Sequence, residues 1–317
     1  MTYDVIIIGG GPAGLTSAIY CQRRQLKTLV IAKAIGGQAA LASEVQNWPG
    51  EKSIGGFELA QKMHDQAKDL AAEFVSDEVI MIEKSDSGLK VKTNSQEYSA
   101  AAVILAFGLT PRDLGVPGEE KFKGRGVSYC ATCDGPLFKN KKVAVVGGGN
   151  SALEAVEYMS KLATQVYLIN NSDKFTGEAE LVKQVSALPN VAVDCNNQIT
   201  EIIGDSKVEK IILADRISKE QKPIDVDGVF VEIGHMPKTG WLKGMVDLND
   251  RGEIVTDKSG MTSAEGIFAA GDCTDVGYKQ MIISAGEGAK AALSAYKYIA
   301  AKNGGTARPD WGICQKK

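Results

Sequence analysis

A glycine-rich turn near the start of the chain constrains its fold more than any other feature. The β-branched apolar run at residues 3–8 ends in Gly9-Gly10-Gly11-Pro12-Ala13-Gly14, and a helix-like stretch at 15–24 and a second apolar run at 27–32 follow. A strand, a glycine turn, a helix and a strand in this order form a βαβ unit. Such a unit binds the pyrophosphate of a dinucleotide at the N-terminus of its helix.

The residues of this turn have distinct expected roles. Gly9 allows the tight turn, Gly11 lets the backbone approach a pyrophosphate, and Gly14 allows the helix to pack closely on the strand. The simpler alternative is an ordinary glycine-rich turn without a ligand. An acidic residue usually ends the second strand and holds the adenosine ribose, but here that place is taken by Ala32. Ribose recognition must therefore differ, through backbone groups or Gln38.

The same pattern returns in the middle of the chain. The apolar run at 142–146 leads into Gly147-Gly148-Gly149-Asn150-Ser151-Ala152, followed by a helix-like stretch at 153–162 and a strand-like run at 165–169. A second βαβ unit of this kind predicts a second dinucleotide-binding domain.

These two units predict the domain organisation. We expect an α/β chain with two Rossmann-like dinucleotide-binding domains, the second inserted into the first. The outer domain, for FAD, is placed at 1–115 and 247–317, and the inserted nicotinamide-type domain at 116–246. Further expected helices lie at 57–70 and 281–301, and further expected strands at 78–91, 97–107, 191–193, 199–203, 207–213 and 228–233.

The composition narrows the function classes. The 317 residues carry a formal net charge of −3, whereas a nucleic-acid-binding surface needs a clustered basic excess. No apolar run approaches the roughly 18 residues that span a bilayer, and the apolar run at 5–8 begins too soon after Met1 for a signal peptide. We therefore expect a cytoplasmic protein that binds neither nucleic acid nor a membrane.

A pair of cysteines in the inserted domain carries the chemistry. Cys130 and Cys133 have the spacing in which one thiolate attacks a disulfide and the other resolves the mixed disulfide. Structural zinc is the competing interpretation, but zinc normally takes four ligands, and the sequence offers no second CxxC and only two histidines, His64 and His235. We expect no metal site. Asp134 follows the pair and either relays protons to a thiolate or caps a turn.

The chain resembles the low-molecular-weight bacterial thioredoxin reductases over nearly its whole length. The matching segments are Gly36-Gly37-Gln38, Asn47-Trp48-Pro49-Gly50, residues 122–128, residues 130–135, and Gly271-Asp272 with Gln280. The C-terminal half is equally similar to the flavoprotein component of alkyl hydroperoxide reductase, especially at residues 134–138 and 279–283.

This resemblance implies an FAD-dependent disulfide oxidoreductase that forms a homodimer. In such enzymes electrons pass from a nicotinamide through the flavin to the cysteine pair, and a domain rotation exposes the dithiol to thioredoxin. Phe107 departs from the family pattern, which usually has threonine at this position. The expected FAD contacts are Gly9, Gly11, Pro12, Ala13, Gly14, Gly37, Gln38, Asn47, Gly108, Asp272, Lys279, Gln280 and Met281.

Two other functions remain open at this point. The similarity to the hydroperoxide reductase flavoprotein favours a peroxiredoxin or a glutaredoxin-like carrier as an alternative electron acceptor. A non-enzymatic alternative is a flavin-binding regulatory protein whose nicotinamide domain is vestigial. Thioredoxin is the leading partner because the cysteine pair lies between two nucleotide-binding motifs.

The electron donor is where the sequence departs most from the family. NADPH-using members carry a histidine and arginines after the second strand of the inserted domain, where this sequence has Asn170, Asn171, Ser172 and Thr176. A charge-assisted hydrogen bond contributes on the order of 1.5–3 kcal/mol, so the loss of two disfavours NADPH by roughly 10²–10⁴-fold.

The retained glycine turn nevertheless favours nucleotide binding. We expect NADH as the donor, with Asn170 hydrogen-bonding the adenosine hydroxyls, and ferredoxin as the alternative donor. The expected nicotinamide-nucleotide contacts are Gly147, Gly149, Asn150, Ser151, Ala152 and Asn170.

Four further cysteines are not assigned to the redox centre. Cys21 and Cys195 are expected to be small buried hydrophobes, and Cys273 has no partner in the sequence. Cys314 lies in the C-terminal tail, whose role the sequence does not define.

Overall fold

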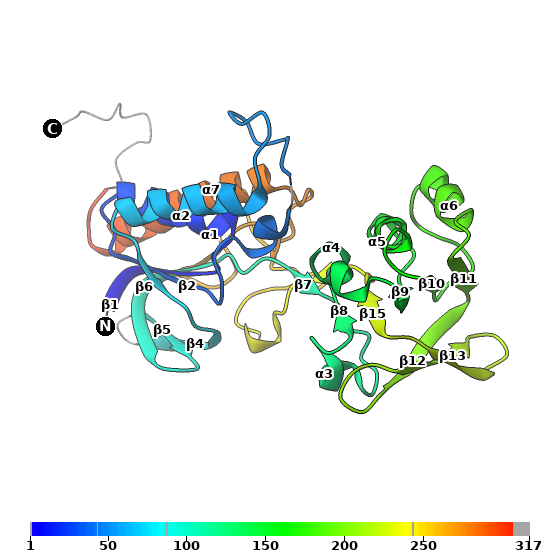
Figure 1. Cartoon of the computed structure of the whole chain (residues 1–317). Helices are drawn as coiled ribbons and strands as arrows, with labels where there is room; N and C mark the ends of the chain where they lie inside the picture. Colours follow the sequence, from blue (N-terminus) through cyan, green and yellow to red (C-terminus); the bar gives the residue numbers. More distant parts are fainter. Residues whose placement is uncertain (1, 43, 86–87, 243, 307–317) are drawn as a thin grey trace. The chain divides into compact units, whose positions relative to one another are not determined.

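Parallel sheets organise both of the units into which the chain divides (Figure 1). Unit 1 comprises Met1–Leu109 and Met236–Lys317, and unit 2 comprises Thr110–His235. The boundaries expected from the sequence, at 115/116 and 246/247, lie further along the chain. The two-domain architecture with an inserted second domain is confirmed. The computed structural model describes residues 2–42, 44–85, 88–242 and 244–306.

The sheet of unit 1 is built round the first glycine-turn strand. Its strands follow the order β3 (Glu73–Val75), β2 (Thr28–Ile31), β1 (Thr2–Ile8), β6 (Glu97–Leu105), β5 (Gly88–Thr93) and β4 (Val79–Ser85), with β17 (Ile267–Ala269) also paired to β6. β1 runs parallel to β2 and β6, and all its residues from Val5 to Ile8 are buried. An apolar strand buried on both faces is typical of a parallel sheet covered by helices.

Helices pack on this sheet and complete the core of unit 1. They are α1 (Pro12–Arg23), α2 (Gly56–Asp69) and α7 (Met281–Lys302), which lie together on one side of the sheet in Figure 1, with the short 3₁₀ turns η1 (Gly37–Leu41) and η3 (Gly240–Leu242). The cluster around Val5, Ile7 and Phe268 joins the sheet to α1 and α7. Residues from both ends of the chain therefore share one hydrophobic core.

The helices α1 and α7 cross at close range. Ser17 Oγ lies 2.8 Å from the Ala13 carbonyl oxygen and 2.9 Å from the Gly288 carbonyl oxygen. A Cβ atom on Gly288 would lie 2.1 Å from the Ala13 carbonyl oxygen, so only glycine permits this approach. The crossing positions the N-terminal half of α7 beside the start of α1.

Unit 2 repeats the βαβ design around the second glycine turn. Its parallel sheet has the order β11 (Val191–Cys195), β10 (Gln165–Asn170), β9 (Lys142–Val146), β15 (Gly228–Val231) and β8 (Val127–Ser128). Beside it lies an antiparallel sheet of β12 (Asn197–Ile203), β13 (Lys210–Asp215) and β14 (Gln221–Asp225). The helices are α3 (Glu119–Phe122), α4 (Ala131–Asp134), η2 (Gly135–Phe138), α5 (Asn150–Ser160) and α6 (Ala179–Ser186). The short strands β7 (Thr110–Pro111) and β16 (His235–Met236) pair where the chain enters and leaves the unit.

The sequence predicted the long elements better than the short ones. The expected strand at 142–146 is β9, and the expected helix at 281–301 is α7 with one residue more. The sequence analysis did not identify α6, β3 or β14, which are short and carry little periodic apolar pattern. In the described part of the chain, no helix combines the length and the apolar character that a membrane crossing requires.

Two glycines of α7 provide a matched test of the α1–α7 crossing. We expect Gly288→Ala to lower the free energy of unfolding by roughly 1–3 kcal/mol, because its new methyl group meets the Ala13 backbone. Gly286→Ala lies on the same helix and meets nothing within 4 Å, so it should raise stability by about 0.4–1 kcal/mol. Thermal unfolding followed by circular dichroism distinguishes the two, and equal effects would contradict the close crossing.

Candidate functional site

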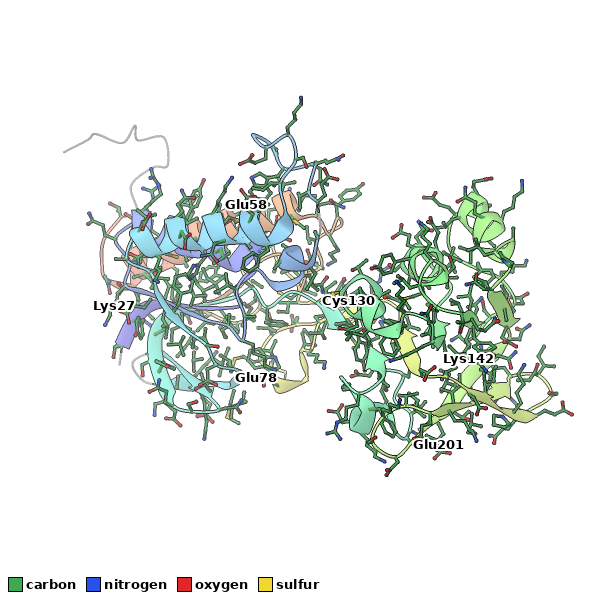
Figure 2. The ribbon with its side chains drawn as sticks, in the orientation of Figure 1. Lys27, Glu58, Glu78, Cys130, Lys142 and Glu201 are labelled. Atoms are coloured by element: carbon green, nitrogen blue, oxygen red, sulfur yellow. A yellow bond between two sulfur atoms is a disulfide. The ribbon has the colours of Figure 1, made fainter. Side chains whose placement is uncertain are left out.

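The cysteine pair forms a disulfide at the start of α4. Cys130 and Cys133 are bonded to each other, with their Cα atoms 5.3 Å apart, and Figure 2 labels Cys130 in unit 2. The backbone N–H of Cys133 donates to Cys130 Sγ over 3.3 Å, and the Thr132 hydroxyl lies 3.4 Å from the same sulfur. Two donors therefore face Cys130 Sγ. Among the described residues, no cluster of three or more His, Cys, Asp or Glu side chains is arranged to hold a metal ion.

Asp134 is held in place by a buried serine that the sequence analysis did not single out. Ser128 Oγ donates to Asp134 Oδ2 over 2.6 Å and accepts from the Cys130 backbone N–H over 3.1 Å. Ser128 lies on β8, directly paired with Phe230 of β15. The sheet therefore fixes the serine, and the serine fixes the carboxylate beside the disulfide.

The first glycine turn of unit 1 leaves room for a phosphate-bearing ligand. A Cβ on Gly14 would lie 1.9 Å from the Gly9 carbonyl oxygen, whereas a Cβ on Gly11 would have only the Gly36 carbonyl oxygen within 4 Å, at 3.9 Å. The backbone at Gly11 therefore faces open space, and no side chain caps the N-terminus of α1. Unsatisfied N–H groups at a helix N-terminus are suited to binding a pyrophosphate.

The second FAD segment predicted from sequence lies against the first. A Cβ on Gly271 would lie 2.9 Å from the Ala13 Cβ, so the turn that carries Asp272 contacts the start of α1. Ser284 Oγ of α7 donates to Asp272 Oδ1 over 2.8 Å. The glycine turn and the Asp272 carboxylate, far apart in sequence, therefore border the same part of unit 1, and they fit a flavin dinucleotide.

Other expected FAD residues make contacts within the protein. Lys279 Nζ donates to the carbonyl oxygens of Asp272 and Thr274, over 3.1 and 2.5 Å, and pairs with Glu253 Oε1 at 3.0 Å. Lys279 therefore braces the Asp272 turn. Asn47 Nδ2 donates to Gln280 Oε1 over 3.1 Å, which joins two of the expected contacts.

The remaining expected FAD residues lie on turns of unit 1. Gln38 Nε2 donates to the Leu109 carbonyl oxygen over 2.6 Å, so its amide nitrogen is already used within the protein. Gly37 and Gly108 have φ values of 53° and 65°, in the left-handed region that favours glycine. Met281 is the first residue of α7 and packs against the cluster around Leu15.

The departure at Phe107 has a structural explanation. Its ring packs against Trp241, with the ring centroids 5.6 Å apart in an edge-to-face arrangement. Both residues border the large core cluster of unit 1. The aromatic side chain therefore contributes to packing where the family pattern has a threonine.

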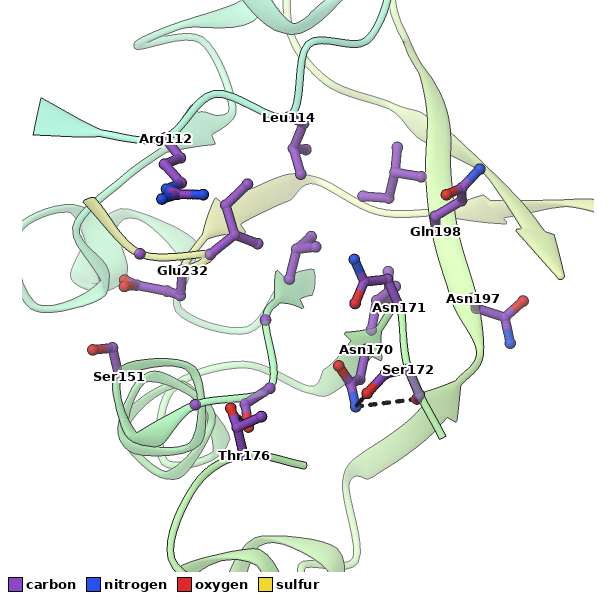
Figure 3. Close-up of a pocket in the computed structure, with 18 residues that line it drawn as sticks. Arg112, Leu114, Ser151, Asn170, Asn171, Ser172, Thr176, Asn197, Gln198 and Glu232 are labelled. Carbon is purple, nitrogen blue, oxygen red and sulfur yellow. Dashed lines mark hydrogen bonds between the residues drawn. The ribbon is translucent and has the colours of Figure 1, made fainter. Parts of the chain in front are cut away.

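Unit 2 contains a pocket of about 590 Å³ at the carboxyl ends of its parallel strands. The glycine turn after β9 lies at its centre, as Figure 3 shows. Ligands of open α/β sheets bind at this edge. The polar side chains that line the pocket are Arg112, Ser151, Asn170, Asn171, Ser172, Thr176, Asn197, Gln198 and Glu232.

Only some of the expected nicotinamide contacts line this pocket. Gly147, Gly149, Ser151 and Asn170 do so. The remaining two are Asn150, whose Oδ1 accepts from the Glu178 backbone N–H over 2.8 Å, and the buried Ala152.

Asn170 shapes the loop that follows β10. Its Nδ2 donates to the carbonyl oxygens of Ser172 and Lys174, over 3.2 and 3.0 Å. Its Oδ1 is directed at Gly148, where a Cβ atom would lie 2.6 Å from it. The amide nitrogen is therefore used within the protein, while the side-chain oxygen faces the glycine turn.

Two charged side chains near the pocket were not found from the sequence. Glu232 follows β15, and burial raises its pKa to about 7 despite an opposing hydrogen bond from the Ala131 backbone N–H. Arg216 Nη1 donates to the Asn171 carbonyl oxygen over 2.5 Å and brings a guanidinium beside the loop after β10. Neither residue belongs to a local motif, so only the fold reveals their positions.

The comparisons with known proteins agree with this arrangement. Residues 3–288 match the model of the pyridine nucleotide-disulphide oxidoreductases. The thioredoxin reductase of Treponema pallidum is 42% identical over 299 residues, covering 94% of this chain and 97% of its own length.

The chain belongs to the pyridine nucleotide-disulphide oxidoreductase family.

Longer members of this family are also similar. The NADH dehydrogenase of Bacillus subtilis and the AhpF-type component of the Pseudomonas putida alkyl hydroperoxide reductase are each 41% identical over 94% of this chain. The chain spans only 58% of the length of either protein. The resemblance predicted from sequence, to thioredoxin reductases and to the hydroperoxide reductase flavoprotein, is confirmed.

Solved structures of the family place the fold with the thioredoxin reductases. The Lactococcus lactis thioredoxin reductase matches with a TM-score of 0.81 and 34% identity, covering 94% of this chain and 99% of that one. A ferredoxin-flavin thioredoxin reductase from Clostridium acetobutylicum matches with a TM-score of 0.53 and 33% identity, covering 95% and 99%. The expected enzyme class, an FAD-dependent disulfide oxidoreductase, is confirmed at the level of the family.

The remaining cysteines lie away from the disulfide in sequence. Cys21 and Cys273 are fully buried, and Cys195 is partly exposed at the end of β11. Cys314 lies outside the described residues.

Thiol labelling separates the redox pair from the buried cysteines. Burial raises the pKa of Cys21 and of Cys273 to about 12, so at pH 8 only about 10⁻⁴ of either thiol is the reactive thiolate. After mild reduction of the native protein, we expect iodoacetamide to modify Cys130 and Cys133 and to spare the buried pair, as read by peptide mass spectrometry. Unfolded protein is the control and should be labelled at all four; native labelling of Cys21 or Cys273 would contradict their burial.

Proposed function

We propose that the chain is a thioredoxin-disulfide reductase that passes electrons from NADH through FAD and the Cys130–Cys133 disulfide to thioredoxin. The observation that carries the proposal is the formed disulfide in the unit that also contains a nucleotide pocket. A CxxC pair beside a nucleotide site is suited to moving two electrons at a time.

Unit 1 is proposed to hold the FAD. The open backbone at Gly11 would receive the pyrophosphate, and the Asp272 carboxylate, fixed by Ser284, would accept hydrogen bonds from ligand hydroxyls. When bound, FAD supplies the chemistry that accepts a hydride and delivers its two electrons to a disulfide.

The residues around the disulfide manage its charge and protons. Two electrons and two protons convert the Cys130–Cys133 disulfide into two thiols. The Cys133 N–H and the Thr132 hydroxyl face Cys130 Sγ and would stabilise it as a thiolate. We assign the attack on the partner's disulfide to Cys130 and the release of the mixed disulfide to Cys133. Asp134, positioned by Ser128, would give a proton to the leaving thiolate of the partner.

The side chains of the pocket support NADH as the donor. The loop after β10 presents Asn170, Asn171 and Ser172, which are uncharged. Asn170 Oδ1 remains available as an acceptor for a ribose hydroxyl. Among the described side chains that line the pocket, Arg112 is the one cation, and Figure 3 shows it on the opposite side of the glycine turn from Asn170. Arg216 is the cation that could recognise a 2′-phosphate, so it enters the test of donor preference below.

Ferredoxin is the second candidate donor. It is supported by the similarity to the ferredoxin-flavin thioredoxin reductase of Clostridium acetobutylicum. The retained pocket around Gly147 and Gly149 favours a nucleotide instead, because a ferredoxin-dependent enzyme has no need of such a cavity.

Thioredoxin is the proposed acceptor, because this chain covers nearly the whole length of the thioredoxin reductases that it matches. The similarity to the hydroperoxide reductase flavoprotein supports a peroxiredoxin or a glutaredoxin-like carrier as the second candidate. A homodimer in the cytoplasm completes the proposal, since a dithiol intermediate requires a reducing compartment. A purely regulatory flavoprotein would hold FAD that no donor reduces.

Removal of one sulfur tests the route of the electrons. We expect Cys133→Ser to abolish NADH-dependent reduction of thioredoxin while the bound flavin is still bleached by NADH, because only the step after the flavin needs the sulfur. The measurement is coupled turnover alongside anaerobic flavin absorbance. Cys195→Ser changes a cysteine outside the disulfide and should turn over normally; activity retained by Cys133→Ser would exclude the proposed route.

Anaerobic titration of the bound flavin identifies the donor. We expect NADH to bleach it at concentrations at least about tenfold below those needed for NADPH, because an uncharged loop offers no partner for a 2′-phosphate. Arg216→Ala should leave the NADH titration unchanged and weaken NADPH only if its guanidinium reaches that phosphate. Arg125→Ala, also exposed and outside the pocket, is the control. Preferential bleaching by NADPH or by reduced ferredoxin would overturn the proposed donor.

A further inference from the structure

Glu232 occupies the opposite end of the pocket from Asn170. In the sheet of unit 2, β9 lies between β10, which ends at Asn170, and β15, which Glu232 follows. Figure 3 shows Glu232 on one side of the glycine turn and Asn170 with Ser172 on the other. The carboxyl group therefore lies beyond the turn, away from the loop that would receive the adenosine.

This order of strands assigns each end of the pocket to one half of a dinucleotide. Adenosine binds at the end of the strand next to the glycine turn, and the pyrophosphate lies over the turn itself. A nicotinamide nucleotide, which the proposed function requires, then extends its other half over β15 towards Glu232. Its redox-active ring is the group that meets this carboxyl.

The backbone contact at the turn fixes where Glu232 stands. A Cβ on Gly147 would lie 2.2 Å from the Glu232 carbonyl oxygen, so the turn and the residue after β15 touch directly. The carboxyl is partly buried and accepts a hydrogen bond from the Ala131 backbone N–H. The loss of water on burial outweighs this hydrogen bond and favours the neutral form of the carboxyl.

The charged groups around Glu232 come from several elements. Glu154 of α5 opposes ionisation, and burial and this charge together bring the pKa of Glu232 to about 7. Arg112 of β7 lines the same pocket, and its charge acts in the other direction. His235 lies three residues further along, and burial lowers its pKa below the usual value, so it is neutral above pH 7. Glu232 is therefore the group whose charge changes between pH 6.5 and 8.5.

We propose that Glu232 reads the charge of the nicotinamide ring, binding the uncharged ring of NADH in its protonated form and the cationic ring of NAD⁺ in its ionised form. The oxidised ring carries one positive charge that the reduced ring lacks. A carboxylate beside it stabilises the cation, whereas beside a neutral ring it only suffers the loss of water. The same carboxylate favours the positive charge that the ring gains as hydride leaves it.

The sign of the pH dependence follows. Binding of a neutral ring and an anionic pyrophosphate raises the pKa of Glu232 above its value in the free protein. Affinity for the reduced form is then fully present below the free pKa and falls as pH rises towards the bound pKa. A cationic ring lowers the pKa, so affinity for the oxidised form is retained as Glu232 ionises.

The test uses holoenzyme with FAD bound and two ligands that do not reduce it. These are NAD⁺ and 1,4,5,6-tetrahydro-NAD, whose ring is uncharged and cannot donate hydride. Isothermal titration calorimetry between pH 6.5 and 8.5 should show the Kd for tetrahydro-NAD rising about tenfold relative to that for NAD⁺. ADP-ribose, which lacks the ring, reports the effect of the pyrophosphate alone.

Glutamine substitutions isolate the carboxyl. Glu232→Gln keeps the shape and can still accept from Ala131, so the ratio of the two Kd values should become independent of pH. Glu154→Gln should move the midpoint of the wild-type curve to lower pH, because it removes a charge that opposes ionisation. Glu180→Gln, an exposed residue of α6, should reproduce the wild type.

The outcomes separate this inference from the proposed function. If both ligands bind wild-type protein with a ratio that does not change with pH, or if Glu232→Gln keeps the wild-type change, the role of Glu232 is wrong and the donor stands. If neither ligand binds at any pH while the flavin remains in place, both the nicotinamide donor and the role of Glu232 are wrong.

Discussion

Close contact between backbone segments at glycine is the constraint on which the rest of this structure depends. In unit 1, Gly14 sits so near the Gly9 carbonyl oxygen that α1 can start immediately after β1. Gly288 lets α7 touch the Ala13 carbonyl oxygen, and Gly271 sets the Asp272 turn against the same residue. Each contact would be lost with a single methyl group. Together they bring two distant parts of the chain to the border of one cradle.

Unit 2 uses the same constraint for a different result. Gly147 approaches the carbonyl oxygen of Glu232, and Gly148 approaches the side chain of Asn170. The turn is thereby fixed between the ends of β10 and β15. One glycine segment thus places an amide at one end of the pocket and an acid at the other. The chemistry of the two ends differs because the neighbouring strands differ, although the turn is symmetrical in composition.

The sequence predicted features that depend on neighbours in the chain. Both βαβ units and the CxxC pair are local patterns, and the structure contains them with small shifts at their ends. Ser128 and Arg216 escaped notice because their roles arise from strand pairing and from a loop contact far away in sequence. Lys279 illustrates the opposite limit. Its position was expected from the resemblance, yet its ammonium group binds carbonyl oxygens and Glu253 within the protein.

The contact between Glu232 and the Ala131 N–H connects the pocket to the redox pair. Ala131 immediately follows Cys130, and its amide is part of the short turn that also directs the Cys133 N–H at the sulfur. When Glu232 is ionised it accepts a stronger hydrogen bond from this turn than when it is neutral. The charge of a ligand in the pocket can therefore act on the backbone that holds the disulfide without any movement of one unit against the other. Because a single carboxyl serves both neighbours, binding at the nucleotide pocket and the stability of the Cys130 thiolate become linked equilibria in which each must influence the other equally.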